Sequence, residues 1–211
     1  MKKEIYFEDI SYEIPERLEE AEQLAKTARL KDPFPKILPS LLNRHDIIKY
    51  VSKTGVIFPF SEKQLKSASY EVNVGNEYIR WTRNKDGKVI KDHKCNLEQH
   101  DKIPLVRNSI TFIDVDATFL IPFYIALRFN LSITHVHRGL LLGTGPLIDP
   151  GFCGKIMIPI HNLTNNNYYL RPGSPLIAVE FTKLTPDDIL EEDKIKQYGL
   201  EKLDKLYGKN I

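Results

Sequence analysis

The chain has 211 residues, of which 42% are hydrophobic, so it is long enough to bury one sizeable core. Its 30 basic and 28 acidic residues leave a net charge of +2, which gives no sign of nucleic acid or an anionic membrane as a partner. Two cysteines are too few for a disulfide framework, and no apolar run approaches the ~18 residues of a membrane span. The first 20 residues lack the apolar stretch of a secretion signal, so we expect a soluble protein of the cytoplasm.

Two helices are predicted near the N-terminus. Residues 15–30 place leucine and alanine at helical spacing behind Pro15, which suits a first helical turn. Three prolines within residues 31–39 then break the pattern, so this segment is predicted to be a linker. Residues 43–55 form the second expected helix, with Asn43 as its N-cap, Asp46 in the position of a capping box and Gly55 at its end.

From residue 56 to about residue 184, short apolar runs rich in valine, isoleucine, tyrosine and phenylalanine alternate with turn residues. The segment NKDGK at 84–88 is typical of a hairpin turn. No helical period interrupts this region, so an all-β sandwich or barrel is favoured over a parallel sheet. Helical signals return after residue 184, where Thr185 suits an N-cap and Pro186 a first helical position.

Four motifs in the middle of the chain resemble those of the dCTP deaminase branch of the dUTPase superfamily. In the family's order they are NRHDII at 43–48, IFPFSEKQLKSASYEVNVGN at 57–76, GLLLGTGPLIDPGFCGKI at 139–156 and IHNLTNNNYYLRPGSPLIAVEF at 160–181. The resemblance implies a distorted, jelly-roll-like β-barrel that assembles as a homotrimer with ligand sites at subunit boundaries. We therefore expect a helical extension over residues 1–40, the barrel over 41–184 and a helical tail over 185–211.

Three departures from the family pattern concern its chemistry. In the deaminases a glutamate on the strand after the IDPG turn moves the protons, and the matching residue here is Pro159, which has no titratable group and no backbone donor. The family's RSSxAR motif, whose serines and arginines hold phosphates, is matched by SITHVH at 132–137, so both arginines are missing. Arg128 and Arg138 lie close in sequence and are able to compensate as donors. The family's closing C-terminal segment has no clear counterpart.

The IDPG turn itself is retained. Asp149 matches an aspartate that the dUTPase branch uses to activate water, and Phe152 takes the aromatic position near the sugar and base. A carboxylate in a tight turn of this kind is able to hold a 3′-hydroxyl or a water molecule. The alternative is that Asp149 only accepts hydrogen bonds from its own turn.

Three histidines are further candidates. His135 and His137 are two apart in a predicted strand, so both are expected on one face, and His161 lies on the strand after the turn. With Asp149 they have the residue types of a metal site, but we favour them as phosphate donors and predict no metal ligand. The fold requires no cofactor, although Mg²⁺ can accompany a nucleoside triphosphate.

Three functions remain open at this point. The first is a dCTP deaminase-like protein that binds a pyrimidine deoxynucleotide but has lost the usual deamination mechanism. The second is an active dCTP deaminase or dUTP diphosphatase with a substituted site built on Asp149, His137 and Arg138. The third is a structural or interaction trimer, against which the polar segment HVHRG at 135–139 counts. Asp149 is the catalytic candidate, and the predicted substrate-binding residues are Arg128, Ser132, His135, His137, Arg138, Gly139, Asp149, Gly151 and Phe152.

Overall fold

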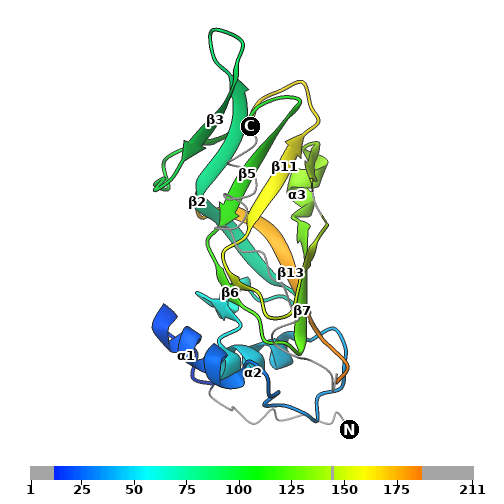
Figure 1. The fold of residues 1–211 in the computed structure, drawn as a ribbon. Coiled ribbons are helices and arrows are strands. Elements are labelled where there is room, and N and C mark those ends of the chain that lie inside the picture. The colour runs from blue at the N-terminus through cyan, green and yellow to red at the C-terminus, as the bar shows by residue number, and fades with distance from the viewer. Residues whose placement is uncertain (1–11, 144, 187–211) are drawn as a thin grey trace.

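The computed structural model describes residues 12–143 and 145–186 of the chain (Figure 1). The helices are α1 (Leu18–Ala28), α2 (Arg44–Thr54) and α3 (Ile133–His137), with a 3-10 turn, η1, at Glu62–Gln64. The strands are β1 (Ile57–Phe58), β2 (Tyr70–Arg83), β3 (Val89–Lys94), β4 (Ile103–Leu105), β5 (Ser109–Val115), β6 (Thr118–Leu120), β7 (Ile125–Leu131), β8 (Leu140–Leu142), β9 (Leu147–Ile148), β10 (Cys153–Gly154), β11 (Met157–Asn162), β12 (Tyr168–Leu170) and β13 (Pro175–Lys183).

Within the described residues, one large antiparallel sheet carries most of the fold. Its strand order is β8-β11-β5-β2-β13-β7-β9, and β3 pairs with the outer part of β2. Two small sheets, β1-β6-β10 and β12-β4, complete the structure. Figure 1 shows the large sheet curled into an elongated half-barrel, with α1 and α2 at one end and the β2–β3 hairpin at the other. The predicted all-β, dUTPase-type barrel core is confirmed.

The core follows from the two-residue alternation of the strands. Along β11, Ile158 and Ile160 are fully buried and point inward, whereas Met157 and His161 are partly exposed on the other face. Along β7, Leu127 and Phe129 are buried, whereas Arg128 is exposed. This alternation decides which side chains of these strands remain available for a ligand or a partner.

The predictions for α2 and the hairpin are confirmed. The side chain of Asn43 accepts a hydrogen bond from the backbone N–H of Asp46 at 3.0 Å, which caps the helix. Gly55 ends α2 with φ +58° and lies so close to α1 that an added Cβ would stand 2.4 Å from the Ala21 carbonyl oxygen. Strands β2 and β3 pair on either side of residues 84–88, as the hairpin signal predicts.

The segment before the barrel is attached to it by buried polar groups. The ammonium of Lys183, at the end of β13, forms an ion pair with Asp32 at 2.5 Å and donates to the carbonyl of Phe34 at 2.8 Å. Asp32 also accepts a hydrogen bond from the hydroxyl of Tyr50 at 3.0 Å, and burial raises the pKa of that hydroxyl above its usual range. These contacts fix the proline-rich linker against α2 and β13.

Two predicted elements differ in the structure, and a third lies outside the described residues. Helix α1 begins at Leu18, three residues after Pro15, which therefore precedes the helix. Residues 133–137 form the short helix α3, so the prediction of a strand with His135 and His137 on one face is wrong. The predicted helical tail falls almost wholly on residues 187–211, which lie outside the described residues.

Candidate ligand-binding site

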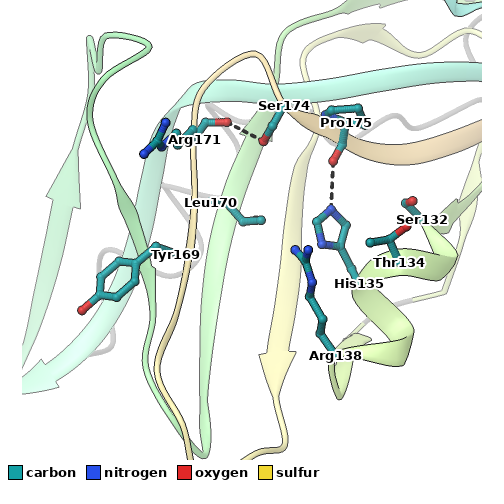
Figure 2. Close-up of a pocket in the computed structure, with 9 residues that line it drawn as sticks. All are labelled: Ser132, Thr134, His135, Arg138, Tyr169, Leu170, Arg171, Ser174 and Pro175. Carbon is teal, nitrogen blue, oxygen red and sulfur yellow. Dashed lines mark hydrogen bonds between the residues drawn. The ribbon is translucent and has the colours of Figure 1, made fainter.

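A pocket of about 360 Å³ lies between α3 and the turn that joins β12 to β13 (Figure 2). Five of its lining residues come from the β12–β13 region and four from the segment that contains α3. The lining residues are Ser132, Thr134, His135, Arg138, Tyr169, Leu170, Arg171, Ser174 and Pro175. The pocket thus joins two stretches of chain that are about 30 residues apart in the sequence.

Local hydrogen bonds fix both walls of the pocket. On the α3 side, the backbone N–H of His135 donates to the Ser132 carbonyl at 2.9 Å, and that of Arg138 donates to the His135 carbonyl at 3.0 Å. On the other side, Gly173 takes φ +78°, and the Ser174 hydroxyl donates to the Arg171 carbonyl at 2.6 Å. This Pro-Gly turn carries Arg171 on the β12–β13 side of the pocket, with its guanidinium pointing away from α3 (Figure 2).

The pocket has the electrostatics of an anion site. Arg138 and Arg171 are both exposed, and neither has an ion-pair partner among residues 12–143 and 145–186. None of the nine lining residues is a carboxylate, and four of them carry hydroxyl groups. Guanidinium and hydroxyl groups without a competing carboxylate are suited to phosphate oxygens.

His135 is the buried member of this pocket, with 6% of its surface exposed. Its Nε2 lies 2.8 Å from the carbonyl oxygen of Pro175, and because a carbonyl only accepts, Nε2 carries the proton. Its Nδ1 is buried and has no hydrogen-bond partner within the described part of the chain. In Figure 2 the ring stands between the Pro175 carbonyl and the side chain of Arg138.

The IDPG turn forms a second candidate cluster. Gly151 takes φ +81° and packs against the ring of Phe123, where an added Cβ would stand 2.5 Å from Cε1. The guanidinium of Arg29, just after α1, lies 5.0 Å from the centre of that ring and 3.4 Å from the Cys153 sulfur. The Asp149 carboxylate is exposed, and among the described residues no hydrogen bond reaches it, which weighs against a purely structural role.

The two clusters lie at opposite ends of β7 within one chain. Ile148, just before Asp149, pairs with Leu127 near the start of β7, whereas α3 begins after Leu131 at its end. Four residue steps along β7, from Leu127 to Leu131, separate these positions, a distance of about 13 Å at ~3.3 Å per residue. The exposed Arg128 lies on β7 beside Leu147, outside the pocket lining. The structure therefore groups Ser132, His135 and Arg138, but not Arg128, Asp149, Gly151 or Phe152, in the pocket.

A family model described as dCTP deaminase-like matches residues 41–184 of the chain. The chain belongs to the dCTP deaminase-like family. Among its relatives, the protein named "dCTP deaminase, dUMP-forming" of Coprothermobacter proteolyticus is 25% identical over 154 residues, which cover 69% of this chain and 80% of the relative. The protein of the same name in Nanoarchaeum equitans is 25% identical over 185 residues, covering 77% and 93% respectively.

The fold comparison agrees with this family. The 2'-deoxycytidine 5'-triphosphate deaminase of Agrobacterium tumefaciens superposes with a TM-score of 0.55 at 14% sequence identity. The match covers 80% of this chain and 54% of that structure, so it supports the shared fold alone. No helix among residues 12–143 and 145–186 is long and apolar enough to cross a membrane.

Pro159 occupies the position at which the dCTP deaminase-like pattern has a glutamate, and the structure shows how a proline is accommodated there. It lies buried in β11, opposite Phe112 of β5, and its carbonyl accepts from the N–H of Gly143 at 2.8 Å. The paired residues of β8 and β11 end with Ile160 and Leu142. The missing N–H of Pro159 therefore falls one residue beyond the last of these pairs. The proline thus costs only the reciprocal bond of the Pro159–Gly143 pair, at the end of the β8–β11 ladder.

A buried carboxylate lies on the same face of the sheet as the side chain of Pro159. Asp114 of β5 pairs with Met157, two residues before Pro159, so the two side chains are diagonal neighbours on one face. Asp114 is 3% exposed, accepts from the backbone N–H of Glu77 at 2.7 Å, and lies 3.8 Å from the ammonium of Lys155. Burial raises the pKa of the Asp114 carboxyl from 3.8 to about 6.

This shift predicts a pH-dependent stability. The folded protein holds the Asp114 proton more tightly than the unfolded chain, so protonation stabilises the fold, and stability falls as the pH rises from about 4 to about 6. The expected loss is about 3 kcal/mol, levelling off above pH 6. The Asp114→Asn variant should lack this slope, which urea unfolding of both proteins from pH 4 to 8 measures. Identical pH dependence of the two proteins would contradict the shift.

The histidines do not form a cluster. His135 is buried in the pocket, His137 is exposed on α3 outside the pocket lining, and His161 lies on β11 beside Leu141. No group of three histidine, cysteine, aspartate or glutamate side chains in the described part of the chain is placed to hold a metal ion. Gly139 takes φ +80° and ends the α3 segment without lining the pocket.

Sequence reasoning missed the β12–β13 side of the pocket. Tyr169, Arg171 and Ser174 belong to the segment YYLRPGS at 168–174, whose resemblance to the family pattern predicts the fold but no ligand contact. An arginine directly before a Pro-Gly turn is a usable signal for an anion site. Its significance depends, however, on the pairing of β13 with β7, which brings the turn next to α3.

Proposed function

We propose that the protein binds a pyrimidine deoxynucleoside triphosphate and does not deaminate it by the mechanism of its family. The observation that carries this proposal is the pocket of Arg138, Arg171 and His135, which offers cationic groups and no carboxylate. Pro159, where the family carries its proton-moving glutamate, supports the second half of the proposal. The curated relatives named dCTP deaminase support the choice of nucleotide.

The phosphates would lie in the pocket, with each guanidinium donating to phosphate oxygens. Ser132, Thr134 and Ser174 supply further hydroxyl donors around them. A bound Mg²⁺ would enter with the triphosphate, because the pocket lining offers it no carboxylate ligand. Recognition of the triphosphate therefore rests on arginine geometry together with the Pro-Gly turn that positions Arg171.

The base and sugar would be held by the IDPG turn of a neighbouring subunit in a homotrimer. The resemblance to the dUTPase superfamily supports such a composite site, and within one chain the turn and the pocket lie about 13 Å apart along β7. In this arrangement Phe152 would stack near the base, and the exposed Asp149 carboxylate would accept the 3′-hydroxyl of the sugar.

Hydrolytic deamination at C4 of cytosine needs a group that takes a proton from water and passes it to the leaving amine. Proline at position 159 offers no such group, and its side chain packs against Gly143, whose added Cβ would stand 3.3 Å from the Pro159 Cβ. Water beside the base would thus remain unactivated at this position. A bound nucleotide is expected to be held without chemical change.

A second candidate function is deamination through a relocated carboxylate. One observation favours it: Asp114 lies diagonally from Pro159 on the same face, and its pKa is raised to about 6. Against it, the carboxylate is 3% exposed and occupied by the Glu77 N–H. If this candidate is correct, dCTP releases ammonia with wild-type protein and not with Asp114→Asn.

Binding is tested by thermal unfolding with a panel of ligands. We expect dCTP or dUTP, with Mg²⁺, to raise the melting temperature, and ATP at equal concentration to raise it less. A ligand present at 100 times its Kd stabilises the native state by about 2.7 kcal/mol. Equal shifts for all nucleotides would contradict pyrimidine recognition, and no shift with any of them would contradict nucleotide binding. Sedimentation as a monomer with bound nucleotide would contradict the composite site.

A further inference from the structure

We infer that the N-terminal segment, residues 12–40, is part of the ligand site, because its Arg29 holds the IDPG turn in the shape that accepts the sugar and base. This inference rests on the proposed function and gives the segment a role in it. The segment lies outside residues 41–184, the part of the chain that the family model matches. Arg29 acts here as a positioning residue, through the turn.

The end of α1 is fastened to the connection between β6 and β7. The carbonyl of Arg29 accepts a hydrogen bond from the backbone N–H of Phe123 at 3.0 Å, and the carbonyl of Ala28 accepts one from the Tyr124 hydroxyl at 2.8 Å. Ala28 and Phe123 are both buried. The side chain of Arg29 therefore starts from a backbone position that the barrel itself defines.

From this position the Arg29 side chain reaches the IDPG turn. Its Nη2 donates to the Gly151 carbonyl at 3.5 Å and its Nη1 donates to the Cys153 sulfur at 3.4 Å. The guanidinium also lies over the Phe123 ring, 5.0 Å from the ring centre, where the ring quadrupole attracts a cation. Gly151 packs against the edge of the same ring, since an added Cβ would stand 2.5 Å from Cε1. Arg29, Phe123 and Gly151 thus contact one another.

These contacts act on the turn between its two proposed ligand groups. Gly151 takes φ +81° and lies between Asp149 and Phe152 in the chain. The Phe152 N–H donates to the Asp149 carbonyl at 3.3 Å, and the Phe152 carbonyl accepts from the N–H of Ile121 at 2.8 Å. A shift of the Gly151 carbonyl would consequently move the Asp149 carboxylate relative to the Phe152 ring. The arginine fixes the distance and angle at which these two groups meet a sugar and base.

The geometry predicts a loss that is selective for one end of the nucleotide. Within one chain the turn and the phosphate pocket lie about 13 Å apart along β7. Arg29 does not line that pocket. Loss of its guanidinium should therefore weaken the binding of a nucleotide but leave the binding of a bare polyphosphate unchanged.

The test is isothermal titration of the full chain with dCTP and Mg²⁺, and separately with inorganic tripolyphosphate, which has no sugar or base. The variant is Arg29→Met, which keeps an unbranched side chain beside the Phe123 ring and removes the guanidinium. We expect dCTP to bind about tenfold more weakly and tripolyphosphate to bind as it does to the wild type. The matched control is Arg17→Met, in the same segment, whose guanidinium donates to Glu20 at 2.8 Å on the surface. It should bind both ligands like the wild type.

A second measurement uses only the wild-type protein. Coupling between two parts of a protein is reciprocal, so a ligand that depends on the contact also strengthens it. We expect dCTP to slow hydrogen exchange at the N–H of Phe123, which is bonded to the Arg29 carbonyl, as well as in the IDPG turn. Tripolyphosphate should slow exchange at neither place.

The outcomes separate this inference from the proposed function. Unchanged dCTP affinity in Arg29→Met, or an equal loss of affinity for dCTP and tripolyphosphate, would overturn the inference and leave nucleotide binding intact. Binding of dCTP to the wild type without slower exchange at Phe123 would overturn it as well. No binding of dCTP to the wild type would contradict the proposed function, and the inference with it.

Discussion

Replacing both Arg138 and Arg171 with alanine is expected to weaken triphosphate binding by about two to four orders of magnitude. Both arginines line the pocket, and neither has an ion-pair partner among the described residues. A hydrogen bond to a charged group contributes roughly 1.5–3 kcal/mol, and tenfold in Kd corresponds to about 1.4 kcal/mol. Titration of the variant with dCTP and with tripolyphosphate measures the loss directly.

The matched control is Arg83→Ala. Arg83 lies at the end of β2 in the hairpin, where its Nη1 donates to the Gly87 carbonyl at 2.8 Å, outside the pocket lining. This variant also loses a positive charge, so it separates local contacts from the effect of net charge. Both arginine positions of the pocket are exposed, so the variants should unfold like the wild type. Unchanged affinity in the double variant would place the triphosphate elsewhere.

Replacing Lys183 with methionine is expected to lower the free energy of unfolding by about 3 kcal/mol. The methionine fills a similar volume but leaves the Asp32 carboxylate without its cation, and removing one partner of a buried pair costs about 3–5 kcal/mol. We expect the lower end of that range because Asp32 keeps hydrogen bonds from Tyr50 and from the Phe34 N–H. Urea unfolding of the two proteins gives the difference.

Two further variants make this prediction specific. The double variant Lys183→Met with Asp32→Asn has no buried charge at this position. Its loss in free energy of unfolding should therefore be smaller than the sum of the losses of the two single variants. Lys66→Met is the surface control: the ammonium of Lys66 is 3.1 Å from Glu71, but the side chain is 59% exposed, and the expected change is below about 1 kcal/mol. A similar loss in both lysine variants would show that burial of Lys183 is not the cause.

The sequence was sufficient where local signals agree with the final structure. The two ends of α2 could be predicted from Asn43, Asp46 and Gly55, because capping depends on neighbours within four residues. The NKDGK segment defines its hairpin for the same reason. The barrel core could be predicted from four motifs in order, since each fixes a turn or strand that the others require.

Long-range features were not accessible in this way. Helix α3 has only five residues, too few for a helical period, and Ile133, Thr134 and Val136 favour a strand by their β-branched side chains. Tertiary packing of α3 against β8 prevails over that preference. Strand pairing brings Arg171 and His135, more than 30 residues apart in the sequence, to the lining of one pocket, and Asp114 is buried by contact with Gly75. Such contacts follow from topology, which composition and spacing do not specify.

The most direct measurement is ammonia release from dCTP at a saturating concentration, with nucleotide products followed in parallel and a dCTP deaminase assayed alongside. With Pro159 in place of the proton-moving glutamate, we predict that dCTP raises the melting temperature, releases no ammonia above the rate without protein, and is recovered unchanged. Ammonia formed in equal amount to dUTP or dUMP, in a reaction that depends on the protein, would contradict binding without deamination.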